Sequence, residues 1–245
     1  VLLLHGRGSH PDEPNIMNPL RTNLDMTSIY SLQLPVLSKG KTYREYSSIF
    51  NYSTSRIQQA INYIADNNDN DIIIIAHSCG VHMLMDYIEK FSTNYITALI
   101  LIGAGAVDKN ESMAEPYPYG IIKIPVLNIY GENDHGSVLH NTLIFNEFTQ
   151  TIFHKKSEQI KIIGSNHDHI DNQKILSDIV NSPPQINVNV NVSTKKFDNS
   201  VFEVGLEIES KAMVGEKTGF ILELEYCGIF TLNCDPEVEK PLVLI

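Results

Sequence analysis

The sequence is poor in cysteine, in basic residues and in long apolar runs. Its three cysteines form no CxxC pair, so they indicate neither a disulfide framework nor a thiolate metal site. Lys and Arg number 18 against 29 Asp and Glu, and the formal net charge of −11 offers no overall positive field to the phosphates of nucleic acid. The apolar run 72–76 is far shorter than the roughly 20 residues of a membrane-spanning helix. We therefore expect a cytoplasmic protein with no nucleic-acid partner, no metal ion and no membrane span.

The chain is long and apolar enough for a substantial buried core. It has 245 residues, of which 42% are hydrophobic, so we expect a globular protein with one large or two small domains. The first residue is Val1, and the chain both begins and ends within an apolar run. From this we expect both ends to be truncated, which would leave any targeting segment outside the sequence.

Up to about residue 182, short apolar runs alternate with segments of helical periodicity. Several runs are apolar throughout, as in parallel strands covered on both faces. Strands are predicted at 1–4, 27–34, 72–76, 98–102, 126–130 and 159–163. Helices are predicted at 81–91, 139–153 and 172–180, and a further helix over 57–65 is expected to start from an N-cap within 53–55. The pattern predicts an α/β fold with a mostly parallel sheet and helices on both faces.

The pattern changes at Pro183 and Pro184, which end the last predicted helix. Beyond them, apolar residues alternate with polar ones in the segments 186–192, 202–208 and 220–226, as in half-buried antiparallel strands. We therefore expect two domains, an α/β domain at 1–182 and a small antiparallel β domain at 183–245.

The segment 71–80 predicts a nucleophile. Here an apolar strand leads into the turn Ala76-His-Ser-Cys-Gly80 and then into a helix. Such a turn holds its middle residue, Ser78, in a strained conformation, and the small residues two positions before and after it avoid clashes. Ser78 would then lie at the start of a helix, whose dipole favours developing negative charge. The ordinary alternative is a strand-to-helix turn with a capping serine.

A serine nucleophile needs a base, and the base needs a carboxylate that orients it. Asp134 and His167 follow two later predicted strands, at the carboxyl ends where open α/β sheets place their sites. We assign Asp134 as the acid, with Glu132 as the alternative, and His167 as the base, with His169 as the alternative. Taken singly, each of these side chains would be interpreted as an ordinary residue of a surface loop.

An acyl-transfer site also needs two backbone N–H donors for the oxyanion. The turn at Ser78 is expected to supply the N–H of Cys79. The loop after the first predicted strand, which contains Gly6, is expected to supply the N–H of Arg7. The glycine-rich segment 103–106 lacks the third glycine of a dinucleotide fingerprint, so no cofactor is predicted.

Together these motifs resemble the α/β-hydrolase superfamily. The resemblance covers residues 1 to about 182 and rests on His5-Gly6, 76–80, 131–134 and His167, in the chain order Ser, Asp, His. It implies a serine hydrolase that cleaves an ester or related acyl bond of a small-molecule substrate. Two features depart from the superfamily: its first strands would precede Val1, and Ala76 replaces the commoner glycine.

Residues 183–245 instead resemble the SecB protein-export chaperone, through the segments 184–190, 204–209 and 220–230. That family is a cytoplasmic homotetramer that holds unfolded precursor proteins and passes them to the SecA motor. By position, Ile221 and Glu223 match outward sheet residues that contact SecA. The resemblance covers only the middle of that chaperone, without the parts that form the tetramer.

Two functions are therefore expected from the sequence. The first is a serine hydrolase that carries a SecB-like segment. The alternative is a SecB-like protein that binds unfolded preproteins and SecA, with an inactive hydrolase-like part. The junction is either a genuine gene fusion or an artificial joining of two partial reading frames.

Overall fold

The computed structural model of the chain describes residues 1–26, 28–67, 71–91, 93–150, 156–181, 186–196, 202–212, 220–222 and 242–244. The chain divides into two compact units, Val1–Pro183 and Pro184–Ile245. Among the helices in the described ranges, none combines the length and the apolar character that a membrane crossing requires.

A parallel sheet of six strands forms the centre of the first unit. The strands are β1 (Leu2–Leu4), β2 (Tyr30–Leu32), β3 (Ile72–His77), β4 (Ile96–Ile102), β5 (Val126–Asn133) and β6 (Glu158–Asn166). They lie in the order β2-β1-β3-β4-β5-β6, and every neighbouring pair is parallel. All six strands predicted from the sequence are present, with ends that differ by a few residues.

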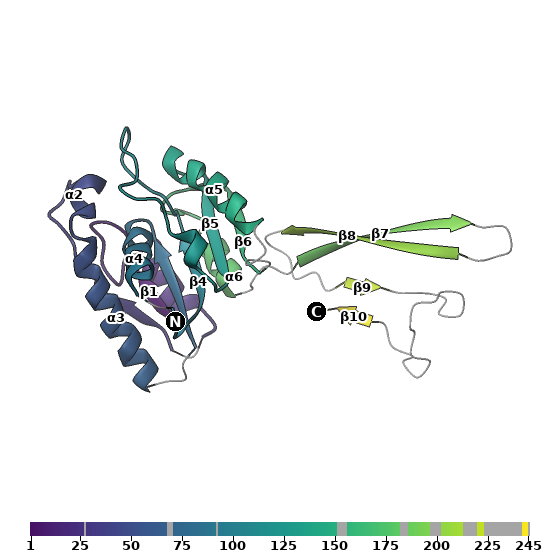
Figure 1. Cartoon of the computed structure of the whole chain (residues 1–245), viewed down its shortest axis with the longest axis horizontal. Helices are drawn as coiled ribbons and strands as arrows, with labels where there is room; N and C mark the ends of the chain where they lie inside the picture. The colour runs from purple at the N-terminus through teal and green to yellow at the C-terminus, as the bar shows by residue number, and fades with distance from the viewer. Residues whose placement is uncertain are drawn as a thin grey trace. The chain divides into compact units, whose positions relative to one another are not determined.

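Helices cover both faces of this sheet (Figure 1). One face carries α3 (Phe50–Asn67), α4 (Cys79–Lys90) and α5 (Gly136–Thr149), and the other carries α1 (Met17–Asn23) and α6 (Gln173–Asn181). Two short helices, α2 (Tyr43–Ser47) and the 3-10 helix η1 (Tyr119–Ile121), lie in the connections. Within β1, Leu2 and Leu4 belong to the first core and Leu3 to the second. Because both faces are covered, the central strands β1, β3 and β4 are apolar at almost every position, and the predicted α/β fold is confirmed.

The start of α3 was predicted wrongly. The helix begins at Phe50 rather than at a cap within 53–55, and Ser53 is buried inside it, where its hydroxyl donates to the Phe50 carbonyl. A capping box formed by Thr42 and Glu45 instead starts the preceding short helix, α2. Residue 27 of the second predicted strand and residues 151–153 of the helix predicted at 139–153 lie outside the described residues.

In the second unit, the described residues form two antiparallel strand pairs. β7 (Ile186–Lys196) pairs with β8 (Phe202–Ala212), and β9 (Phe220–Leu222) pairs with β10 (Leu242–Leu244). Ile221 belongs to β9. Glu223 and the rest of the strand predicted at 220–226 lie outside the described residues.

The order of the strands determines where a site can form. From β1 the chain passes to β2 on one side and then to β3 on the other side. Such a reversal leaves a crevice at the carboxyl ends of the two central strands, and open α/β sheets bind ligands there. Leu4 of β1 pairs with Ala76 of β3, so the loop after β1 and the turn after β3 meet at this crevice.

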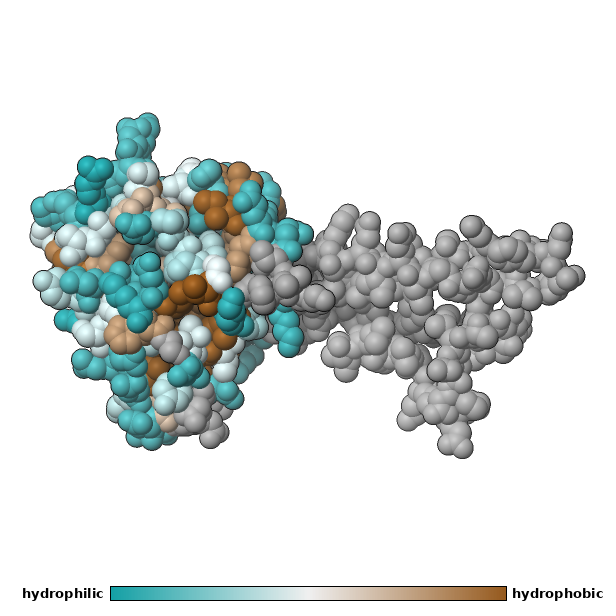
Figure 2. All heavy atoms as spheres, in the orientation of Figure 1, coloured by the Kyte–Doolittle hydropathy of each residue, from teal (hydrophilic) through white to brown (hydrophobic). Residues whose placement is uncertain are grey.

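On the face shown in Figure 2, the described part of the first unit is mostly hydrophilic. Several hydrophobic patches interrupt it, and the exposed large hydrophobic residues of this unit include Leu143, Ile163 and Ile170. The patches are separate, as is usual for the surface of a folded protein.

Candidate active site

Ser78 alone forms the turn between β3 and α4. Its φ of 54° and ψ of −119° are values that residues other than glycine rarely adopt. The chain approaches itself so closely here that a Cβ at position 80 would lie 2.6 Å from the carbonyl oxygen of His5. Only Gly80 fits, and Ala76 on the other side of the turn is fully buried. The turn has the strained geometry that the small residues predicted.

A chain of hydrogen bonds joins Ser78, His167 and Asp134. Oγ of Ser78 lies 2.9 Å from Nε2 of His167, and Nδ1 of the same ring lies 2.6 Å from Oδ1 of Asp134. Each of the three residues directly follows a strand: β3, β6 and β5 respectively. Because Nδ1–H donates to the carboxylate, Nε2 can accept the proton of the serine hydroxyl. The structure thus brings together the three residues selected from the sequence.

The carboxylate of Asp134 is almost fully buried. It accepts backbone hydrogen bonds from His135 at 2.7 Å and from Gly131 at 3.3 Å, besides the one from His167. Burial acts to raise the pKa of Asp134, but the hydrogen bonds and the charge of His167 outweigh it, so that the pKa is lowered. The group is therefore ionised at neutral pH, as orientation of an imidazolium requires.

The two alternatives from the sequence lie elsewhere. Glu132 is exposed and accepts a hydrogen bond from the backbone N–H of Gly164 at 3.0 Å. His169 is fully buried, and its Nδ1 lies 2.8 Å from Oγ of Ser165 rather than near Ser78. The geometry favours Asp134 and His167.

The two residues proposed for the oxyanion hole line the same cavity as Ser78, which has a volume of about 420 Å³. Cys79 is the first residue of α4, so its N–H has no acceptor within the helix. Arg7 lies in the turn after β1. The thiol of Cys79 is buried, and burial raises its pKa to about 12, which makes a thiolate nucleophile unfavourable.

The side chain of Arg7 holds this loop through an ion pair that sequence analysis missed. Its guanidinium donates two hydrogen bonds to the carboxylate of Asp108, which lies in the loop after β4. One of these hydrogen bonds is 2.8 Å long. Asp108 also accepts the backbone N–H of Tyr43 at 2.6 Å. The hydrogen bond to Asp108 raises the pKa of Arg7, and the pKa of Asp108 is lowered in return. The loop that carries the Arg7 N–H is therefore tied to two neighbouring segments.

Two further residues that sequence analysis missed position His167. His77 is buried, and its Nε2 lies 3.2 Å from the carbonyl oxygen of His167. Burial, followed by repulsion from His167, lowers the pKa of His77 to about 3, so its neutral ring can donate to that carbonyl. Gly103 follows β4 with φ 62°, and a Cβ there would lie 2.7 Å from Cε1 of His167. A glycine directly after a strand was the only signal for this contact in the sequence.

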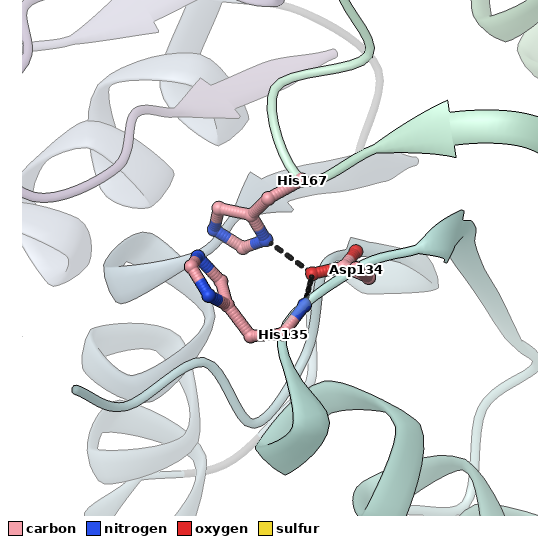
Figure 3. A group of neighbouring side chains, drawn as sticks. All are labelled: Asp134, His135 and His167. Carbon is pink, nitrogen blue, oxygen red and sulfur yellow. Dashed lines mark hydrogen bonds and ion pairs between the residues drawn. The ribbon is translucent and has the colours of Figure 1, made fainter. Parts of the chain in front are cut away.

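Within the described residues, Asp134, His135 and His167 also form a group that could hold a metal ion (Figure 3). Each offers one ligand atom, and these atoms lie within 4.8 Å of one another. Such a set of nitrogen and oxygen atoms would suit Zn²⁺. In this arrangement, however, Asp134 and His167 form a hydrogen bond with each other, and the ring of His135 packs against that of His167 with centroids 4.4 Å apart. The observed contacts are those of a hydrogen-bonded relay.

Comparison with known proteins gives the family. A family model described as a protein of unknown function (DUF3530) matches residues 38–181, which is more than half of the chain. The chain belongs to the DUF3530 family. The matched region includes Ser78, Asp134 and His167 of this DUF3530 protein.

The first unit of the DUF3530 protein has the α/β-hydrolase fold, as its motifs predicted. Est1E from Butyrivibrio proteoclasticus, solved with ferulic acid bound, superposes with a TM-score of 0.53 at 14% identity, over 74% of this chain and 85% of that one. A monoacylglycerol lipase from Paleococcus ferrophilus superposes with a TM-score of 0.50 at 12% identity, over 68% and 84% of the two chains. At these identities the likeness shows the fold alone.

The DUF3530 protein also carries a SecB-like segment, as predicted. A family model for the preprotein translocase subunit SecB matches residues 167–245. The protein-export protein SecB of Bradyrhizobium diazoefficiens is 42% identical over 64 residues, which are 26% of this chain and 40% of that protein. The chain therefore spans about two fifths of the length of this relative.

Proposed function

We propose that the first unit is a serine hydrolase that cleaves an ester or related acyl bond of a small molecule. The observation that carries the proposal is the hydrogen-bonded chain from Ser78 through His167 to Asp134, with Ser78 in a strained turn at the start of a helix. The α/β-hydrolase fold supports it as well, because the three residues follow strands in the chain order used by that fold.

In the first half of the reaction, Oγ of Ser78 attacks the carbonyl carbon while its proton passes to Nε2 of His167. Asp134 stabilises the imidazolium that forms. The negative oxygen of the tetrahedral intermediate accepts hydrogen bonds from the N–H groups of Arg7 and Cys79. The bond to the leaving alcohol then breaks, the alcohol takes the proton from His167, and an acyl-enzyme remains.

In the second half, water attacks the acyl-enzyme. His167 takes one proton from the water and returns it to Oγ of Ser78 as the acyl bond to the serine breaks. The acid leaves, and the site returns to its starting state without a cofactor.

Hydrolysis of para-nitrophenyl acetate and butyrate by the intact chain, beside its Ser78→Ala variant, tests this function. We expect release of nitrophenol by the unmodified protein and not by the variant. Equal rates for the two proteins would contradict the proposal.

Gly103→Ala is expected to lower kcat/KM for such an ester on the order of 100-fold. The added methyl group would overlap the ring of His167, and the positive φ of position 103 is unfavourable for alanine. The imidazole must then move away from Ser78. Steady-state kinetics measure the effect, with circular dichroism to verify folding.

Gly120→Ala is the matched control. Among the described residues, no atom lies within 4 Å of a Cβ placed at position 120, so this variant is expected to keep its activity within about twofold. If the two variants lost activity equally, the role given to Gly103 would be wrong.

A second function is favoured by the sequence match of residues 167–245 to SecB. In this proposal the segment binds unfolded preproteins and SecA, with Ile221 and Glu223 in contact with SecA. It becomes the main function if Ser78→Ala leaves ester hydrolysis unchanged.

Binding of the intact chain to SecA, measured by calorimetry, tests this second function. Glu223→Lys is expected to weaken binding about tenfold or more, because a charge of the wrong sign would face the partner. Glu207→Lys on β8 is the control and is expected to bind as the unmodified chain does. Undetectable binding, or equal binding by all three proteins, would argue against it, as would failure to suppress aggregation of an unfolded client.

A further inference from the structure

A second and larger cavity adjoins the one that contains Ser78. Its volume is about 770 Å³, and the loop after β4 and the first half of α5 line it. The two cavities share four lining residues, namely Val107, Asp108, Lys109 and His135. His135 also packs against the ring of His167. The two cavities therefore border each other at His135, beside the ring of His167.

Asn141 of α5 lines this larger cavity and has an unsatisfied polar atom. The residue is 1% exposed, and its Nδ2 donates to the hydroxyl of Tyr119 at 3.1 Å. Its Oδ1 has no hydrogen-bond partner within the part of the chain that the structure describes. Buried polar atoms in proteins are nearly always paired, and an unpaired one costs about 1–3 kcal/mol. Because Asn141 lines the cavity, a donor group on a ligand bound there is the candidate partner of this buried oxygen.

The lining combines apolar residues with polar ones, among them Asp108, Lys109 and His140, and its apolar residues indicate what could carry that donor. Val107, Met113, Pro116 and Ile144 are apolar, and they lie in the same lining as Asn141. Ligand sites commonly combine an apolar wall, which binds the body of the ligand, with a few polar atoms that fix its orientation. A hydroxyl group on a largely apolar body matches both features.

We propose that the larger cavity is a substrate subsite that receives an apolar part of the ester bearing a hydroxyl group, which donates a hydrogen bond to Oδ1 of Asn141. This inference rests on the proposed hydrolase function and names its substrate class. Discrimination arises because an ester without the hydroxyl leaves Oδ1 unpaired in the complex, whereas the hydroxylated ester pairs it.

The test compares matched esters with and without a terminal hydroxyl. One set consists of para-nitrophenyl hexanoate, octanoate and decanoate, each beside its hydroxylated counterpart. The other set consists of hexyl and octyl butyrate, each beside the ester with a terminal hydroxyl on the alcohol. At the length that reaches Asn141, we expect the hydroxyl to raise kcat/KM about tenfold, on one of the two sets. The set that responds identifies which side of the ester occupies the subsite.

Variants of α5 test whether the preference for hydroxylated esters depends on Oδ1 of Asn141. In Asn141→Leu, the ratio of kcat/KM for the hydroxylated ester to that for its partner is expected to fall to about one. Asn141→Asp keeps an acceptor, so its ratio is expected to stay well above one. Thr142→Val is the matched control, because Thr142 is also buried on the same helix and is not among the residues that line the cavity. Its ratio should equal that of the unmodified chain.

The outcomes separate this inference from the function on which it rests. Ser78-dependent hydrolysis with no hydroxyl preference at any length in the unmodified chain would overturn the subsite and leave the hydrolase intact. This outcome does not depend on any variant of Asn141. A preference that survives in Asn141→Leu would overturn the role of Asn141. Absence of Ser78-dependent hydrolysis would overturn both proposals.

Discussion

Replacing Ser78 with alanine is expected to lower kcat/KM for para-nitrophenyl butyrate on the order of 10⁴-fold or more. Without Oγ no acyl-enzyme can form, so the two-step path is lost entirely. The backbone N–H groups of Arg7 and Cys79 remain, and they can assist only a direct attack by water. Steady-state kinetics under identical conditions, with thermal unfolding to verify the fold, measure the effect.

Ser165→Ala is the control for that experiment. Ser165 is also hydrogen-bonded to a histidine, His169, but both residues are buried and neither contacts Ser78 in the observed hydrogen bonds. This variant should retain activity within severalfold. A large loss of activity in Ser165→Ala, together with full activity in Ser78→Ala, would place the reaction at Ser165 and His169 and contradict the assignment.

The next largest effect is expected for Asp134→Asn, a loss of kcat on the order of 10³–10⁴-fold. The asparagine has nearly the same shape, so the fold should be unchanged. It lacks the charge that stabilises the imidazolium, and its amide can hold His167 in the tautomer that has its proton on Nε2. That tautomer cannot accept the proton of Ser78. Comparison of kcat for the variant and the unmodified chain on one ester measures the loss.

Glu132→Gln tests the alternative carboxylate. Glu132 is exposed, and its carboxylate accepts a hydrogen bond from the backbone N–H of Gly164 in β6 rather than from His167. Its replacement is expected to change kcat by no more than severalfold. If Glu132→Gln were the more damaging of the two substitutions, the acid would have been assigned to the wrong residue.

The strands and the triad candidates could be predicted from the sequence because each depends on local pattern. β3 is buried on both faces, so Ile72 to Ala76 form a continuous apolar run. Ser78, Asp134 and His167 each directly follow a strand, and the carboxyl ends of parallel strands lie at one edge of a sheet. Knowing the strands was therefore enough to bring these three residues to the same edge.

The residues that contact the candidate triad could not be predicted, because their roles depend on contacts between distant segments. Asp108 is distinguished from other loop carboxylates only by the approach of Arg7, and Gly103 only by the ring of His167. The hydrogen bond from His77 to the carbonyl of His167 spans ninety positions of the chain. Asn141 falls within an ordinary helical segment, and its unpaired oxygen is defined only by the packing around it.

The start of α3 shows a local signal that was interpreted incorrectly. Serine and threonine at 53–55 are typical of an N-cap, but here their hydroxyls bond to carbonyls of the preceding turn inside a longer helix. For the SecB-like segment, the roles of Ile221 and Glu223 stay predictions.

Covalent labelling by a fluorophosphonate probe tests the central claim most directly. The probe phosphonylates a serine only when a neighbouring base activates it and an oxyanion site accepts the charge. We predict one adduct per chain, found by peptide mass spectrometry on Ser78 and absent when Asp134 is replaced with asparagine or the protein is unfolded beforehand. An unlabelled chain, or an adduct on another residue with Ser78 unmodified, would contradict the account.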